Sequence, residues 1–425
     1  MQRRRAQLIP LAGGVLIAGV AVFAKTGGSD PATPPAAIAG PSLTTPVEVA
    51  PPPPTLPKPA PELQLDKLAR NGDHYEAPLA DGRIATLTLD PQLQDAAEKL
   101  LADARAPRAA IVAMAPDGRI LALAGRRTVE PKGGKNGTSD WHLATDVWAP
   151  AASIFKLVTA SALVAGGLDP DEKVAYHGGL RSIVDSNLKD DRRDNNTASL
   201  TFGVAHSNNA IVGKLAYQHL EPSALESAAH DLGLAGPLPA SLALTGTIAE
   251  LTLPHDKTLD FARASAGFSG SRLSVLGGAL LAAAFADGGQ QPIPRIIASI
   301  AGTPQSVEPA HRAIAENVAR AVSKMMIATC DFDNAAQSFR HHTIEVADKT
   351  GTLTTTEPFY MEHSWFVGYA PVDQPQIIVS VLLGNPENWH LRGHEAAKRL
   401  IDLAVGRAPD HAAARSVPQA SNSVR

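Results

Sequence analysis

The chain has 425 residues, too many for one ordinary domain and enough for a large catalytic unit with appendages. Its 38 Lys and Arg residues nearly balance its 42 Asp and Glu residues, and this balance argues against a general nucleic-acid-binding protein. The single cysteine, Cys330, excludes an intramolecular disulfide and a zinc site built from several cysteines.

The amino terminus has the pattern of an export segment. Arg3, Arg4 and Arg5 precede an apolar run, residues 8–24, that contains no charged residue. Basic residues before an apolar segment favour an orientation that leaves everything downstream outside the cytoplasm. Residues 1–25 are therefore predicted to be a transmembrane anchor or a cleaved signal segment, and the length of the run favours the anchor.

Residues 26–62 are dominated by Pro, Ala, Gly and Thr and include four consecutive prolines at 51–54. Such a stretch cannot bury enough apolar surface to fold, and its prolines favour an extended polyproline II conformation. It is predicted to be a linker, either a semi-rigid spacer or a disordered tether. At the other end, the small and polar residues 409–425 are predicted to be a disordered tail.

The folded region is predicted to span residues 63–408. Its strand patterns lie at 84–89, 109–114, 120–124, 364–370 and 377–383, and its helical patterns lie at 91–101, 151–286 and 394–405. Asp117-Gly118 is predicted to form the tight turn between the second and third strands. Strands at both ends that enclose a helical middle predict an α+β fold, whose antiparallel sheet is assembled from distant segments.

The first of three chemically interesting motifs lies in the apolar helical run after residue 150. Ser153 and Lys156 are three residues apart, so on a helix the lysine amine can reach the serine hydroxyl. A serine hydroxyl is a weak nucleophile until a neighbouring base takes its proton, and a lysine in suitable surroundings can be that base. Because Ser-x-x-Lys arises by chance in many chains, this pair alone is weak evidence.

The second motif, Ser207-Asn208-Asn209, stands at the start of a helical pattern. Taken alone, Ser207 is most simply interpreted as the residue that caps this helix.

The third motif is Lys349-Thr350-Gly351-Thr352, which follows a strand-like segment. A lysine and two threonines on a strand edge, with a glycine that permits close backbone approach, can hold a carboxylate beside a sheet. An ordinary strand or turn with a glycine bulge is the alternative.

In this order the motifs resemble the Ser-x-x-Lys, Ser-x-Asn and Lys-Thr-Gly signatures of the penicillin-recognising serine enzymes. The segments 88–94, 207–216 and 365–371 are also similar to those of penicillin-binding transpeptidases. The resemblance covers about residues 63–408. It implies a β-lactamase/transpeptidase-like α+β fold, in which an antiparallel sheet flanked by helices lies beside a mostly helical subdomain.

The resemblance implies a serine D,D-transpeptidase that cross-links peptidoglycan stem peptides. Ser153 would attack the D-Ala-D-Ala carbonyl to form an acyl-enzyme, and Lys156 would accept its proton. Ser207 would relay a proton toward the leaving amine, and Asn209 would hold the substrate amide and orient Lys156. β-Lactams would mimic the substrate and trap Ser153.

The remaining roles belong to the third motif and its surroundings. Lys349, Thr350 and Thr352, together with Gly351, would bind the terminal carboxylate of the substrate. The backbone N–H groups of Ser153 and Thr352 would form the oxyanion hole. No metal, cofactor or nucleic acid is implied.

The resemblance also has cellular consequences. It implies a single-pass protein of the bacterial inner membrane whose catalytic domain faces the periplasm. Because only the linker separates the predicted membrane segment from the folded region, we expect no glycosyltransferase domain between them and a separate glycosyltransferase partner that supplies the glycan strands.

Two departures from the family pattern stand out. Ala151-Ala152 precedes the nucleophile where many relatives have a glycine after the proline, and Asp348 stands where most have a small residue. A carboxylate at this position either pairs with Lys349 or points to the opposite face of its strand. The alternation of side chains along a strand favours the second geometry.

Three other functions fit the same fold. A β-lactamase of the Ser-Asp-Asn type would need a glutamate in a Glu-x-x-x-Asn context, which neither Glu226 nor Glu250 provides. A D-alanyl-D-alanine carboxypeptidase would use water as the acceptor, and the sequence leaves that choice open. A non-catalytic muropeptide or β-lactam sensor is the third alternative, and Asp348 is its best support, whereas the intact motif residues argue against it.

Two further groups of residues have the composition of possible functional sites. His390 and His394 have a spacing that suits a metal on a helix, but without a third ligand we expect surface histidines. The charged run 189–194 contains the acidic pair Asp190 and Asp191, and we expect a solvated loop near the rim of the cleft.

Overall fold

The structure is a computed structural model that describes residues 61–332, 336–339 and 342–406. The predicted anchor or signal segment (1–25), the tail (409–425) and nearly all of the linker (26–62) lie outside these residues. Within the described ranges, no helix combines the length and the apolar character that crossing a bilayer requires.

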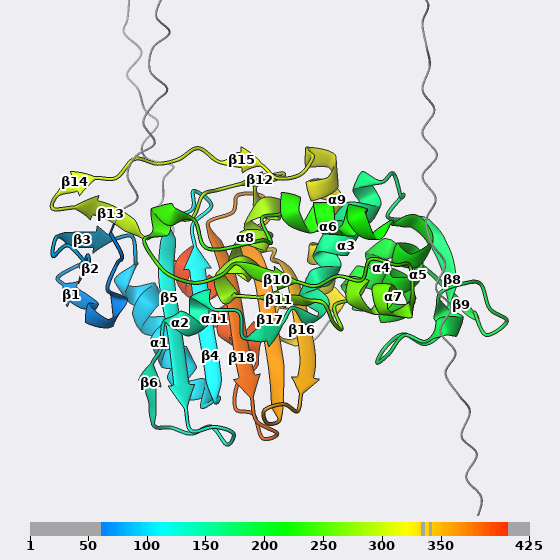
Figure 1. Ribbon diagram of the computed structural model, residues 1–425, viewed down its shortest axis with the longest axis horizontal. Coiled ribbons are helices and arrows are strands. Elements are labelled where there is room, and N and C mark those ends of the chain that lie inside the picture. Colours follow the sequence, from blue (N-terminus) through cyan, green and yellow to red (C-terminus); the bar gives the residue numbers. More distant parts are fainter. Residues whose placement is uncertain (1–60, 333–335, 340–341, 407–425) are drawn as a thin grey trace, which may run out of the picture. The chain divides into compact units, whose positions relative to one another are not determined.

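The framework of the domain is a six-stranded antiparallel sheet with the strand order β16-β17-β18-β4-β5-β6 (Figure 1). Its strands are β4 (Arg108–Met114), β5 (Ile120–Thr128), β6 (Gly137–Ser139), β16 (Ala347–Thr355), β17 (Met361–Ala370) and β18 (Ile377–Asn385). Ile378 of β18 pairs with Met114 of β4, so the two ends of the folded region meet at the middle of the sheet. This pairing confirms the predicted α+β arrangement.

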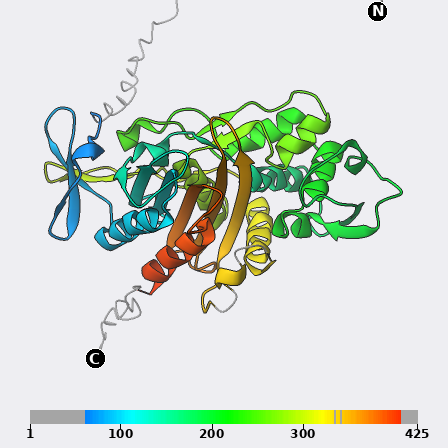
Figure 2. The ribbon, with the colours of Figure 1, turned by 90° about the horizontal axis from the view of Figure 1, so that it is seen from below.

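Helices cover both faces of this sheet because its strands are apolar on both sides. Along β4, Val112 belongs to one hydrophobic core and Ile111 to the other. One face packs against α1 (Pro91–Ala104) and α11 (Gly393–Val405), which lie together in Figure 2. The other face packs against α2 (His142–Thr145) and α8 (Val275–Ala286). Helix α8 is apolar on all sides because almost every one of its residues is buried.

Local sequence signals explain where α1 begins. The Asp90 carboxylate accepts hydrogen bonds from the backbone N–H groups of Gln92 and Leu93, both at 2.9 Å, and Pro91 occupies the first helical position. This cap also ends the preceding strand, β3 (Ile84–Leu87), two residues before the predicted end.

The middle of the chain is mostly helical, as predicted. Its helices, with two from the following segment, are α3 (Lys156–Ala165), α4 (Leu200–Ala205), α5 (Asn209–His219), α6 (Pro222–Asp231), α7 (Leu259–Ser265), α9 (Glu316–Phe332) and α10 (Ala336–Phe339). Helix α3 is the hub, because it contacts α5, α6 and α9 and buries nearly every one of its side chains. Short 3-10 helices lie at η1 (Leu65–Lys67), η2 (Ala152–Phe155), η3 (Asp185–Asn187) and η4 (Ala240–Leu242).

Short strands complete the domain, and of these only β3 was predicted from the sequence patterns. A three-stranded sheet contains β7 (Ala149–Pro150), β10 (Ala249–Leu251) and β11 (Ser271–Leu273), and β8 (Lys173–Tyr176) pairs with β9 (Asn196–Ser199). A five-stranded sheet joins β1 (Ala69–Asn71), β2 (His74–Pro78) and β3 to β13 (Ile297–Ile300) and β14 (Thr303–Pro304). Strand β12 (Gln290–Gln291) pairs with β15 (His311–Arg312).

Candidate active site

The structure brings Ser153 and Lys156 together at the start of the buried helix α3. Ser153 lies in η2, and Lys156 is the first residue of α3. The preceding residue, Ala152, has a left-handed backbone with a φ of 51°, which bends the chain sharply into the helix. The Lys156 Nζ atom lies 2.7 Å from the Ser153 Oγ atom, within hydrogen-bonding distance.

Lys156 joins three separate elements of the chain. Its side chain is fully buried, and its Nζ atom donates hydrogen bonds to Ser153 Oγ, to Asn209 Oδ1 at 2.7 Å and to the Ala266 carbonyl at 2.9 Å. Asn209 begins α5, and Ala266 caps the C-terminus of α7. The amine is thus held in one position, directly behind the serine hydroxyl.

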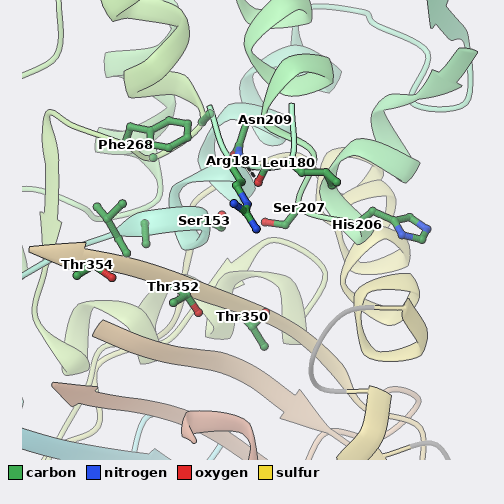
Figure 3. A pocket seen from close by; sticks show the side chains of 14 residues that line it. Ser153, Leu180, Arg181, His206, Ser207, Asn209, Phe268, Thr350, Thr352 and Thr354 are labelled. Atoms are coloured by element: carbon green, nitrogen blue, oxygen red, sulfur yellow. Dashed lines mark hydrogen bonds between the residues drawn. The ribbon is translucent and has the colours of Figure 1, made fainter. Parts of the chain in front are cut away.

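The second motif forms the connection between α4 and α5. The side chain of Asn208, not of Ser207, caps α5 by accepting a hydrogen bond from Ile211 N at 3.1 Å. The interpretation of Ser207 as the helix cap is therefore wrong. Ser207 has a left-handed backbone, with a φ of 53°, and its side chain lines the cavity beside Ser153 (Figure 3).

Strand β16, at the edge of the main sheet, forms the opposite wall. Thr350 and Thr352 line the cavity, whereas Lys349 is fully buried and its Nζ atom donates to the Thr350 carbonyl at 2.8 Å. Among the described residues that line the cavity, the third motif is represented by its threonines and not by its lysine. The strand prediction for this motif is correct, because residues 347–355 pair with β17 in continuous register.

The side chains of Asp348 and Lys349 leave opposite faces of β16. Ala347 packs in the core on the α8 side of the sheet and Val346 in the core on the α11 side, so alternation places Lys349 with Ala347 and Asp348 with Val346. The buried Asp348 carboxyl lies beside Cys330 of α9. Burial, together with this carboxyl, raises the pKa of the Cys330 thiol above its usual range.

Two glycines allow backbone segments to meet at Ser153. A Cβ atom on Gly351 would lie 3.3 Å from Ser153 N, tighter than most real contacts. A Cβ atom on Gly267 would lie 1.8 Å from the Ala152 carbonyl oxygen, which no side chain permits. Gly267 also has a φ of 89°, a backbone conformation that strongly favours glycine. These glycines therefore fix how closely β16 and the end of α7 approach Ser153.

The converging elements enclose a cavity of about 390 Å³. From the predicted site it includes Ser153, Ser207, Asn209, Thr350 and Thr352 (Figure 3). The cavity is also lined by residues that the three motifs did not indicate, namely Leu180, Arg181, His206, Ala266, Gly267, Phe268 and Thr354. Thr354 lies in β16, two residues beyond Thr352, and His206 directly precedes Ser207. No spacing pattern marks the others, because they come from segments between helices and strands that only the tertiary fold brings to Ser153.

The charged run 189–194 was predicted to be a solvated loop, and this prediction is wrong for Asp194, which is buried. Its side chain is 5% exposed and its Oδ2 atom lies 2.9 Å from the Nζ atom of Lys214, whose side chain is 1% exposed. Asp190 contacts the same amine at 2.9 Å but is solvent-exposed. Although burial opposes it, hydrogen bonds to the two carboxylates raise the pKa of Lys214. His177 lies 2.5 Å from the other oxygen of Asp194.

No group of three or more His, Cys, Asp and Glu side chains is placed to hold a metal ion in the part of the chain that the structure describes. His394 belongs to the first turn of α11, and His390 lies in the loop that precedes this helix. The two histidines therefore do not share a helix, although their spacing suggested one.

The sequence matches the family described as "Penicillin binding protein transpeptidase domain" over residues 109–402. It is 26% identical over 334 residues to the peptidoglycan D,D-transpeptidase PbpA of Mycobacterium tuberculosis. The match covers 70% of this chain and 66% of the relative. It is 25% identical over 336 residues to the probable peptidoglycan D,D-transpeptidase PbpC of Pseudomonas aeruginosa. This match covers 75% of this chain and 58% of the relative. The chain thus spans less than two thirds of the length of these relatives.

Solved structures show the same fold. Penicillin-binding protein A of M. tuberculosis, solved as a ceftriaxone acyl-enzyme complex, superposes with a TM-score of 0.63 at 22% identity, covering 76% of this chain and 80% of that one. Penicillin-binding protein 2B of Streptococcus pneumoniae gives a TM-score of 0.62 at 19% identity, covering 77% and 60%. Because the family match extends over more than half of the chain, this protein belongs to the penicillin-binding protein transpeptidase domain family.

Proposed function

We propose that this protein is a serine D,D-transpeptidase that cross-links peptidoglycan stem peptides through an acyl-enzyme on Ser153. The observation that carries the proposal is the position of the Lys156 Nζ atom, 2.7 Å from both Ser153 Oγ and Asn209 Oδ1 at the base of the cavity. A serine, a lysine and an asparagine in this contact form a nucleophile, its base and an orienting group.

The first half of the reaction follows from these contacts. The Ser153 Oγ atom attacks the carbonyl carbon of the D-Ala-D-Ala peptide bond, and its proton passes to Lys156. The backbone N–H groups of Ser153 and Thr352 receive the negative charge that develops on the carbonyl oxygen. The peptide C–N bond then breaks, Ser207 relays a proton to the leaving amine, and D-alanine departs from the acyl-enzyme.

The second half transfers the acyl group to an amine of a neighbouring stem peptide. That amine attacks the ester carbon, loses its proton to the base and restores the Ser153 hydroxyl. On the opposite wall, Thr350 and Thr352 would hold the terminal carboxylate of the donor, and Lys349 would supply the positive charge behind them. Asn209 completes the site by holding the donor amide.

The lining of the cavity favours transfer over rapid hydrolysis. Among the described residues that line it, none carries a carboxylate. A β-lactamase that uses a glutamate to activate the deacylating water needs such a group next to the ester. The acyl-enzyme is therefore expected to be long-lived toward water and open to an amine acceptor.

Covalent labelling of the full-length protein with a fluorescent penicillin tests the proposal. Mass spectrometry is expected to find a stable adduct on Ser153 that the Ser153→Ala variant lacks. Rapid turnover of the penicillin would instead indicate a β-lactamase. The absence of both an adduct and turnover would indicate a non-catalytic sensor and would refute the proposal.

The acceptor is tested with a peptide that ends in D-Ala-D-Ala. A transpeptidase forms an amide product when an amine acceptor is added, and the amount of hydrolysed peptide falls in proportion. A carboxypeptidase would release D-alanine at an unchanged rate and form only the hydrolysed peptide.

The proposal also includes the cellular setting. Residues 1–25 would anchor the chain in the inner membrane as a single pass, and the catalytic domain would act in the periplasm. A fusion of alkaline phosphatase after residue 62 is expected to be active, and an inactive fusion would contradict this orientation. The same setting calls for a glycosyltransferase partner, and repeated pull-downs that recover no glycan polymerase would count against it.

A further inference from the structure

One cation in the cavity has no role in the proposed reaction. Arg181 lines the same cavity as Ser153 and Ser207, and Figure 3 shows its guanidinium pointing toward these two residues. Among the residues that the structure describes, Arg181 has neither a hydrogen-bond nor an ion-pair partner. The chain as a whole carries a net charge of −4, so an unpaired guanidinium beside a nucleophile is not a by-product of a basic surface.

The backbone on both sides of Arg181 is anchored. Asn209 donates from Nδ2 to the carbonyl of Leu180, the preceding residue, at 3.3 Å. On the other side, Ile183 is buried and its carbonyl accepts hydrogen bonds from the Arg263 guanidinium at 3.3 and 3.4 Å. The exposed Arg181 side chain is thus presented by a fixed backbone, attached directly to the residue that would hold the donor amide.

The position of Arg181 relative to the two walls indicates which part of a substrate it would meet. Thr350 and Thr352, on β16, form the wall assigned to the terminal carboxylate and the leaving group. Arg181 stands on the other wall, beside Asn209, where the acyl part of the donor would lie. A guanidinium presents a planar fork of N–H donors that matches a carboxylate.

We propose that Arg181 is a specificity-determining residue that selects acyl donors bearing a second carboxylate on the acyl side of the scissile bond. This inference rests on the proposed acyl-enzyme function of Ser153. The preferred substrate would be a peptide in which the residue before the two D-alanines has a free side-chain carboxylate rather than an amide or a neutral group.

Two penicillins separate this preference from general reactivity. Carbenicillin has the structure of benzylpenicillin with an added carboxylate on its acyl side chain, so both share the reacting ring and the ring carboxylate. The acylation rate constant of each is measured on the full-length protein by competition with a fluorescent penicillin. The ratio of carbenicillin to benzylpenicillin is expected to fall about fivefold in Arg181→Gln, the range of one solvent-exposed charge pair. Arg181→Lys should keep part of the preference.

Arg192→Gln is the matched control. It removes the same charge from an exposed arginine a short distance along the chain, but Arg192 is not among the described residues that line the cavity. Its ratio is expected to equal that of the wild type. Raising the ionic strength should lower the wild-type ratio and leave the Arg181→Gln ratio unchanged.

The outcomes separate this inference from the proposed function. If both penicillins acylate Ser153 and the ratio is the same in wild type and Arg181→Gln, the specificity role is refuted while the acyl-enzyme function stands. If Arg181→Gln slows both penicillins equally, Arg181 supports the site as a whole and the inference also fails. If neither penicillin acylates the wild type, the proposed function itself fails. A matched pair of peptide donors, with a free or an amidated side-chain carboxyl, should show the same ratio change.

Discussion

Replacement of Gly267 with alanine tests whether the close approach of the α7 end to η2 sets the position of the nucleophile. The added Cβ atom would lie 1.8 Å from the Ala152 oxygen, 2.5 Å from the Ala152 carbonyl carbon and 3.3 Å from Ser153 N. Real Cβ atoms stay at least 3.0 Å from such atoms, so the two segments must separate by 3.0 − 1.8 = 1.2 Å. This shift moves Ser153 relative to the amine of Lys156, which is held from the other side by the Ala266 carbonyl.

A misplacement of about 1 Å in a catalytic constellation costs on the order of 100-fold in rate. We therefore expect the rate constant for acylation by benzylpenicillin to fall by about two orders of magnitude in Gly267→Ala. The left-handed backbone at this residue adds a stability cost of about 1–2 kcal/mol, which thermal unfolding measures separately. Acylation is followed by stopped-flow or competition labelling on protein that circular dichroism shows to be folded.

Gly134→Ala is the control, because a Cβ atom on Gly134 meets nothing within 4 Å. It should acylate and unfold like the wild type. A folded Gly267→Ala variant that acylates at the wild-type rate would refute the reasoning, since it would show that the contact between these segments does not position Ser153.

Three further predictions concern buried ionisable groups. Burial lowers the pKa of His363 from 6.5 to about 4, so between these values the unfolded chain binds a proton that the folded protein does not. The contribution of His363 should therefore lower the free energy of unfolding by about 2 kcal/mol between pH 7.5 and pH 5. Denaturant titrations at the two pH values should show a smaller decrease in His363→Gln than in the wild type. Lys214→Met leaves the buried Asp194 carboxylate without its cation, and should lower the free energy of unfolding at pH 7.5 by about 3 kcal/mol; an unchanged value would show that this pair contributes nothing net. Because the Asp348 side chain lies beside Cys330, on the face of β16 opposite to Lys349, Asp348→Asn should keep the rate constant of benzylpenicillin acylation within about twofold of the wild type. A tenfold loss would show that this carboxylate acts on Lys349 after all.

The local elements of the main sheet were accessible from the sequence because their signals are short-range. Asp90 and Pro91 predict the start of α1, because a helix cap and a proline at the first helical position need no tertiary partner. The apolar patterns at 109–114 and 377–383 predicted β4 and β18, although only their antiparallel pairing shows that they are neighbours. The small strands β7 to β11 escaped prediction because two to four residues carry too little periodicity to be recognised.

The candidate site divides in the same way. The identities and order of Ser153, Lys156, Asn209 and Lys349 were evident from the three motifs, because the spacing within each motif is local. Their mutual distances were not, since Lys156 meets Asn209 and Ala266 only through the packing of α3 against α5 and the end of α7.

What the sequence determined by itself was the resemblance to the family and the residues proposed to perform serine acyl transfer, because these depend on residue type and short spacing. Only the tertiary structure decided that Asn208 caps α5, that Asp348 lies beside Cys330, and that Lys349 is buried behind the cavity wall. It alone also brought Arg181 close to Ser153. These features depend on the close packing of residues that lie far apart in the chain, and no local sequence pattern specifies such contacts.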